Sequence, residues 1–206
     1  MTGAAPLRCE GEAFVLLGPS AAGKSTLLPK MEVPSGALVM DGSFIRQESQ
    51  MWRKALGLAR CHGLTGFSDH FEECFKPPMD KLKSSLLEKS IRQRANLIIP
   101  DSASNFPATK RMLEQLLKAG YRLRFAAVYG DEEELLRRGR ARASQEGKQF
   151  TGKNWRASVE AILQLQDYLE TTGLVKDSGL VTVLDNSGPR PEPMSHADLQ
   201  ARLCTH

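Results

Sequence analysis

The chain has 206 residues with 41% hydrophobic and 25% charged residues, ordinary values for a soluble globular enzyme of a single domain spanning residues 1–206. The net charge of +4 is too small to indicate nucleic-acid binding by itself, and no apolar run approaches the ~20 residues of a membrane helix. Residues 1–12 lack the apolar core of a signal peptide, and the four cysteines form no C-x-x-C pair. We therefore expect free thiols, no membrane contact and a cytoplasmic location.

The first predicted strand, residues 13–17, leads into the motif G-x-x-x-x-G-K-[ST], and a helix over residues 24–31 follows. This phosphate-binding loop, called the P-loop below, consists of Gly18, Pro19, Ser20, Ala21, Ala22, Gly23, Lys24, Ser25 and Thr26. A chance match in a turn is the alternative, but the strand before the motif and the helix after it favour a site for a nucleoside triphosphate, ATP or GTP. Lys24 would reach the β- and γ-phosphates, and the Ser25 hydroxyl would hold Mg²⁺, which prefers oxygen ligands.

The second predicted strand covers residues 37–40 and ends at Asp41-Gly42. A carboxylate in this position would take the proton from an acceptor hydroxyl in a small kinase. Asp-Gly is also a common turn pair, so a purely structural role is the alternative. A helix-rich stretch follows over residues 43–94, interrupted near residues 63–68 and at Pro77-Pro78.

The third predicted strand covers residues 97–99 and is followed by Asp101. An aspartate directly after an apolar strand is typical of the Walker B position, where it holds Mg²⁺. The alternative is that Asp101 caps the turn that follows. A helix over residues 110–119 and a fourth strand over residues 121–129 come next.

A helix capped by Asp131 then carries four arginines, at positions 137, 138, 140 and 142, ahead of a polar loop over residues 144–152. Such a cluster is either a solvated helix face or a small basic lid, here over about residues 137–153. In P-loop kinases, lid arginines neutralise the charge of the transferred phosphate, and we expect at least one to do so here. Arg138 and Arg142 share one helix face, and Arg137 and Arg140 a neighbouring one.

The remaining predicted elements are a helix over residues 153–172, a fifth strand over 180–184, a proline-rich turn after Asp185–Gly188 and a tail helix over 195–203. Alternating strands and helices predict an α/β fold with a parallel sheet of about five strands and helices on both faces. Ligands bind at the carboxyl ends of the strands in such folds. The P-loop, Asp41, Asp101 and Asp185–Gly188 all follow predicted strands.

The order of these segments resembles the zeta toxin family of P-loop kinases over about residues 12–188. The resemblance is carried by the P-loop, Val39–Phe44, Asn96–Ile99, Met112–Tyr121, the arginine cluster and Asp185–Gly188. It implies transfer of a phosphate from ATP or GTP, with Mg²⁺, to a hydroxyl. Bacterial members of the family phosphorylate UDP-N-acetyl sugars.

The resemblance implies that Lys24 binds phosphate, Ser25 holds Mg²⁺ and Asp41 is the general base. Arg140 and a neighbour, taken as Arg138, would be the lid arginines, and Asn186 would lie near the adenine. The resemblance does not say whether an antitoxin-like protein partner exists.

This chain departs from the family pattern in two places. The second acid of the family's Asp-x-Asp-x-Phe segment is absent, and Ile99-Pro100-Asp101-Ser102 stands where the family has Ile-Glu-Gly-Thr, whose glutamate helps to bind the sugar substrate. The acceptor is therefore a hydroxyl-bearing small molecule, for which a UDP-N-acetyl sugar is one candidate. A nucleoside, another metabolite or a polynucleotide 5′ end are others. A nucleotide-binding regulatory module with little catalysis is the alternative from another class.

Overall fold

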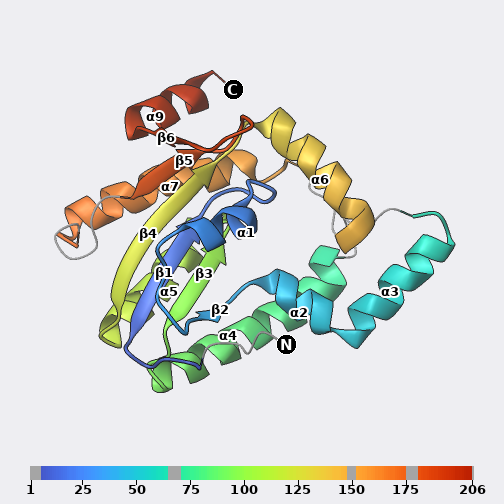
Figure 1. Cartoon of the computed structure of the whole chain (residues 1–206), viewed down its shortest axis with the longest axis horizontal. Helices are drawn as coiled ribbons and strands as arrows, with labels where there is room; N and C mark the ends of the chain where they lie inside the picture. The colour runs from blue at the N-terminus through green and yellow to red at the C-terminus, as the bar shows by residue number, and fades with distance from the viewer. Residues whose placement is uncertain (1–5, 65–70, 148–151, 175–180, 206) are drawn as a thin grey trace.

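The computed structural model describes residues 6–64, 71–147, 152–174 and 181–205. Six strands form one sheet in the order β2-β3-β1-β4-β5-β6 (Figure 1). Strands β1 to β5 run parallel, and β6 pairs antiparallel with β5. The predicted α/β fold with a parallel sheet is confirmed, with one further strand at its edge. The strands are β1 Glu12–Leu17, β2 Leu38–Val39, β3 Leu97–Asp101, β4 Arg122–Tyr129, β5 Thr182–Asp185 and β6 Glu192–Met194.

Helices lie on both sides of this sheet, with α1 in front of it and α5 and α7 behind it in Figure 1. Helix α7 packs against both α5 and α9, whereas α2 packs against α3 and α4. The described helices are α1 Lys24–Leu27, α2 Gly42–Glu48, α3 Gln50–Cys61, α4 Lys76–Arg92, α5 Phe106–Lys118, α6 Glu132–Glu146, α7 Trp155–Thr171 and α9 His196–Cys204. None of them is both long and apolar enough to cross a membrane.

The core consists of the central strands and the helix faces that cover them. Residues 13–17 of β1, 97–99 of β3 and 125–129 of β4 are all buried. Parallel strands covered on both faces require such continuous apolar runs, and each buried large side chain contributes about 1.5–3 kcal/mol. The buried strands therefore form a rigid support for the loops at the carboxyl edge of the sheet.

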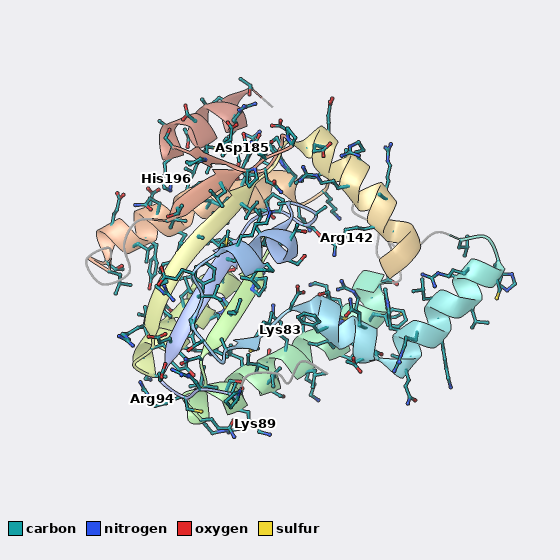
Figure 2. All side chains as sticks on the ribbon, in the orientation of Figure 1. Lys83, Lys89, Arg94, Arg142, Asp185 and His196 are labelled. Carbon is teal, nitrogen blue, oxygen red and sulfur yellow. The ribbon has the colours of Figure 1, made fainter. Side chains whose placement is uncertain are left out.

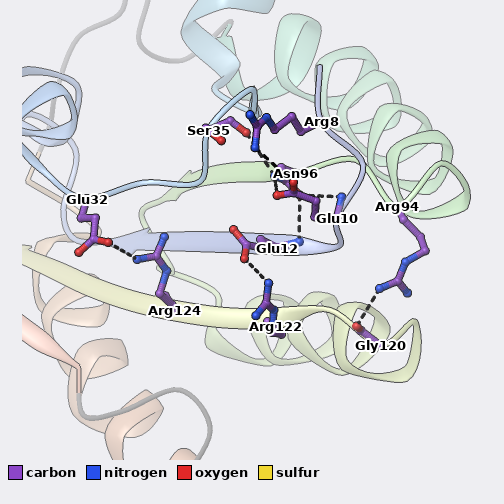
Figure 3. Close-up of polar contacts among 10 residues, drawn as sticks. All are labelled: Arg8, Glu10, Glu12, Glu32, Ser35, Arg94, Asn96, Gly120, Arg122 and Arg124. Carbon is purple, nitrogen blue, oxygen red and sulfur yellow. Dashed lines mark hydrogen bonds and ion pairs between the residues drawn. The ribbon is translucent and has the colours of Figure 1, made fainter. Parts of the chain in front are cut away.

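The opposite, amino edge of the sheet is held by the buried side chain of Asn96 (Figure 3). Its oxygen accepts hydrogen bonds from the backbone N–H groups of Glu10 and Glu12, at 3.1 and 3.2 Å. Its amide donates to the Glu10 carboxylate and to the Ser35 carbonyl. One side chain thus joins the start of β1, the segment before β2 and the start of β3.

Proline accounts for three differences between the predicted and observed elements. The helix predicted over residues 24–31 stops at Leu27, and a 3₁₀ turn with Pro29 follows, since proline lacks the N–H that continues an α-helix. Pro77 and Pro78 lie in the first turn of α4, which follows a π-helical turn over Phe71–Phe75 directly, because the first turn of an α-helix needs no such N–H. Pro193 lies in β6, where an edge strand tolerates it and a turn was predicted.

Candidate active site

The P-loop follows the carboxyl end of β1 and contains two glycines, Gly18 and Gly23, whose backbone conformation and close contacts disfavour any side chain. Gly18 has a φ of +139°, and a Cβ atom there would lie 2.2 Å from the carbonyl oxygen of Val128. Gly23 has a φ of +92°, and its Cβ would lie 2.5 Å from the side-chain nitrogen of Asn186. Both glycines of the motif therefore allow the loop to pass close to β4 and to the turn after β5.

Between these glycines, Ala21 also adopts a left-handed conformation, with a φ of +67°. A non-glycine residue in this region costs on the order of 1 kcal/mol or more, and such strain persists where surrounding structure enforces it, commonly at ligand sites. Left-handed residues within a loop turn successive N–H groups to one side, which creates an anion-binding concavity. Because α1 has only four residues, the loop N–H groups offer more to an anion than the helix dipole does.

Lys24 and Ser25 complete the P-loop at the start of α1. The Lys24 Nζ donates to the carbonyl oxygens of Gly18 and Pro19, the latter at 2.9 Å, so its charge rests on the rim of the loop. Ser25, the next residue, is exposed. An ammonium group and a hydroxyl thus meet at one end of the loop, as binding of a phosphate with a divalent cation requires.

Asp41 lies at the same edge of the sheet, directly after β2 and at the N-cap of α2. Its Oδ1 accepts a hydrogen bond from the Ser43 N–H at 2.8 Å. Strand β2 is separated from β1 by β3, so the carboxylate lies roughly 10 Å to one side of the P-loop at a strand spacing of about 4.8 Å. Asp41 and the P-loop thus lie at the same edge of the sheet, on either side of the end of β3.

Asp101 ends β3 in register with Leu17, the residue before the P-loop. Its Oδ1 accepts from the Ala103 N–H and its Oδ2 from the Thr109 hydroxyl, both at 3.2 Å. These bonds fit the turn-capping alternative, and each carboxylate oxygen still has a second lone pair for a cation. Among the described residues no three His, Cys, Asp or Glu side chains gather to hold a metal. Ser25 and Asp101 offer the oxygen ligands that suit an Mg²⁺ ion shared with nucleotide phosphates.

Asn186 contacts the P-loop itself. Its side-chain amide donates to the carbonyl of Ala22 at 2.8 Å, and its backbone N–H donates to the carbonyl of Tyr129. The side chain thereby ties the end of β5 to the loop after β1. The sequence pointed to this residue as a nucleotide contact, but not to its bond with a residue 164 positions away.

The arginines of α6 are divided between its two sides. Arg138 donates to the Glu134 carboxylate and to the Asn186 carbonyl, both at 2.7 Å, so it lies against the turn after β5. Hydrogen bonds from Arg137 and Arg138 lower the pKa of Glu134 from 4.5 to about 2 and keep it charged. Arg140, about 200° further round the helix, is exposed. Arg142, which is labelled in Figure 2, comes four residues after Arg138 and therefore shares its helix face. Residues 148–151 of the expected lid lie outside the described part of the chain.

A further set of polar residues, which the sequence did not reveal as one group, surrounds this turn. The N–H of Asp131 donates to the Ser187 hydroxyl at 2.9 Å. The Asp131 side chain, predicted to cap α6, instead accepts from the Tyr129 hydroxyl. Burial, followed by this hydrogen bond, raises the pKa of Tyr129, so the phenol remains a donor. Each of these residues follows or ends a strand, which is the only signal the sequence carried.

Comparison with known proteins agrees with this geometry. The sequence matches the zeta toxin family over residues 8–188. The chain belongs to the zeta toxin family. This confirms the resemblance and the P-loop kinase-like fold. A solved structure from the PezAT chromosomal toxin–antitoxin system of Streptococcus pneumoniae shares the fold, with a TM-score of 0.60 and 17% identity over 98% of this chain and 80% of that one. No curated protein matches the sequence.

Proposed function

We propose that this zeta toxin family member transfers the γ-phosphate of ATP to a hydroxyl group of a small molecule. The observation that carries the proposal is the P-loop, strained at Ala21 and closed by Asn186, with the Lys24 ammonium on its rim. The carboxylate of Asp41 at the same sheet edge supports transfer to an acceptor rather than nucleotide binding alone. ATP is proposed as donor, with GTP as the other candidate.

We propose a separate role in phosphate transfer for each of these residues, according to its position. The loop N–H groups and Lys24 would bind the phosphates, and Lys24 would follow the γ-phosphate as its charge grows. Mg²⁺, held by Ser25 and Asp101, would neutralise phosphate charge when bound. Asp41 would orient the acceptor hydroxyl and accept its proton.

Arginines of α6 would close over the triphosphate from the other side. We propose Arg138 and Arg140 for this role, as the family pattern implies. Arg138 donates to the carbonyl of Asn186, whose side chain contacts the P-loop, and this supports its part. Arg142 on the same face is the alternative to the exposed Arg140. Closure of this face would also exclude water, a competing acceptor.

The acceptor is proposed by class. A UDP-N-acetyl sugar is the first candidate, because bacterial relatives in the family phosphorylate it. Pro100-Asp101-Ser102 replaces the family's sugar-binding glutamate, so nucleosides, other metabolites and polynucleotide 5′ ends belong in the same test. We also propose a neutralising protein partner, because the solved structure that shares the fold comes from a toxin–antitoxin system. A cytoplasmic location is proposed from the free cysteines, which are typical of a reducing compartment.

The test is Mg²⁺-dependent transfer of labelled phosphate from ATP to a panel of these acceptors. Wild type would be compared with Lys24→Ala, and with Lys30→Ala as a control for an exposed lysine of the adjoining turn. We expect a labelled product with wild type and Lys30→Ala and none with Lys24→Ala, because the loop loses its mobile charge. Equal transfer by Lys24→Ala would refute the assignment.

The departure at Pro100-Asp101-Ser102 motivates one alternative, a nucleotide-binding regulatory module. It predicts Mg²⁺-dependent ATP binding, lost in Lys24→Ala, with no labelled product from any acceptor. The same preparation decides between the two, because binding and transfer are measured side by side.

A further inference from the structure

We infer that Arg202 on α9 is a positioning residue for the P-loop, acting through the turn Asp185–Ser187, here called the junction turn. The inference rests on the proposed function for the identity of the nucleotide, but its structural part stands on contacts alone. Helix α9 lies beyond residues 8–188, the range shared with the family. An element outside the family match would therefore hold the site at the centre of the family fold.

The first step is the contact between the junction turn and the nucleotide loop. The side chain of Asn186 donates to the Ala22 carbonyl, and its own carbonyl accepts from Arg138. Ala22 lies within the loop, and Arg138 on the helix proposed to close over it. A displacement of the junction turn would thus move both the P-loop and Arg138, the two groups proposed to contact the nucleotide.

The second step is the internal support of the junction turn. Asp185 Oδ1 accepts from both the N–H and the hydroxyl of Ser187, at 2.9 and 2.6 Å. The same hydroxyl oxygen accepts from the N–H of Asp131. The conformation that presents Asn186 to the loop therefore depends on the Asp185 carboxylate and on the start of α6.

The third step is the charge of Arg202. Its guanidinium lies 3.6 Å from the Asp131 carboxylate and 3.9 Å from that of Asp185 (Asp185 is labelled in Figure 2). Asp185 ends β5 and Asp131 follows the neighbouring parallel strand β4 at the N-cap of α6, and the like charges of these two carboxylates repel each other without a cation between them. Arg202 therefore supplies the attraction that keeps Asp131, at the start of α6, beside Asp185 of the junction turn.

The fourth step is the anchoring of Arg202. Leu199 and Leu203 of α9 are buried, and the Ser195 hydroxyl caps the helix by accepting from the Asp198 N–H. The helix is thus fixed on the fold, whereas the Arg202 side chain is 49% exposed and lines an open hollow of about 490 Å³ between β6 and α9. Salt reaches this ion pair, so its effect is modest and screened at high ionic strength.

The experiment compares Arg202→Gln with Arg202→Lys, which keeps the charge, and with Arg190→Gln, an exposed arginine of the same C-terminal segment. We expect Arg202→Gln to raise the Kd and KM for Mg²⁺-ATP about threefold, within the range of exposed ion pairs, with little change in kcat. Arg202→Lys should recover most of the affinity, and Arg190→Gln should match wild type. The difference should shrink in 0.5 M salt.

Amide hydrogen exchange without nucleotide tests the structural part separately. Arg202→Gln should speed exchange in peptides covering residues 18–24 and 185–188, but not in β3, whose protection shows that the fold is intact. Unchanged exchange at residues 18–24, or equally fast exchange everywhere, overturns the inference. If wild type binds no ATP, the proposed function fails, while the exchange result still decides the role of Arg202.

Discussion

Asp41 combines a structural and a proposed chemical role, and one substitution separates them. Asn at this position still accepts the bond from the Ser43 N–H and remains a good N-cap, but it cannot take a proton. We expect Asp41→Asn to keep its thermal stability and its affinity for ATP while phosphate transfer falls at least a hundredfold. Transfer kinetics beside ATP titration check this. Transfer at the wild-type rate would remove Asp41 as the base.

The lowered pKa of Glu134 predicts how the stability of the fold depends on pH. Its pKa is lowered from 4.5 to about 2 in the folded chain by Arg137 and Arg138, so its contribution to stability is complete above about pH 4.5 and is lost as the pH falls towards 2. Glu134→Gln should lower the melting temperature by about 2 °C at pH 7.

The difference in melting temperature between wild type and Glu134→Gln should narrow between pH 4.5 and 2. Thermal melts across this range measure it. The exposed neighbour Glu133 supplies the control, Glu133→Gln, which should show no such narrowing. A gap that has already closed at pH 6 would contradict the assignment.

At the scale of elements, helix α6 ends against α3 through a single glycine. Gly147 has a φ of +75°, and a Cβ there would lie 2.7 Å from the Leu56 side chain and 3.3 Å from that of Trp52. Gly147→Ala therefore combines backbone strain with a clash. Gly173, with a φ of +72° and nothing within 4 Å of its Cβ, isolates the strain.

We expect Gly147→Ala to destabilise the fold by about 1–3 kcal/mol, and Gly173→Ala by about 1 kcal/mol. Urea unfolding measures both. The double substitution Gly147→Ala with Leu56→Ala should show less than the sum of the two losses, because the clash is gone. Additive losses would mean that α6 does not rest on α3 in solution.

The elements that the sequence predicted well are those with continuous apolar runs, such as β1, β3 and β4, since burial on both faces leaves no other pattern. The 3₁₀ turn at Pro29 and strand β6 were not predicted, because proline signals a break without saying what replaces the helix or turn. Within the site, local motifs indicated the P-loop, Asp41 and Asp101. The contacts of Asn186 and Arg202 join residues that are far apart in the sequence, so no local sequence pattern indicates them.

At the scale of the whole molecule, the hydrogen bonds of the Asn96 side chain and the P-loop lie at opposite edges of the sheet. The side chain of Asn96 makes four hydrogen bonds at the amino edge, and Asn96→Ala would leave the N–H groups of Glu10 and Glu12 without these partners. We expect a loss of about 2–4 kcal/mol, with the Kd for ATP unchanged in the molecules that remain folded.

Urea unfolding and ATP titration together check this prediction. Asn154→Ala is the control, because Asn154 is exposed and makes no capping bond. A loss under 0.5 kcal/mol in Asn96→Ala would show that water replaces the buried bonds, and weaker ATP binding would show that the two edges are coupled.

The bond between Asn186 and Ala22 also has a consequence for biosynthesis. Its two residues are 164 positions apart, so the ribosome adds the second roughly 10–30 s after the first. During this interval the nascent chain contains the complete P-loop sequence but not Asn186, whose side chain donates to the Ala22 carbonyl of that loop. We therefore expect the proposed nucleotide binding to appear only after Asn186 has emerged from the ribosome, and a product truncated before Asn186 to lack it.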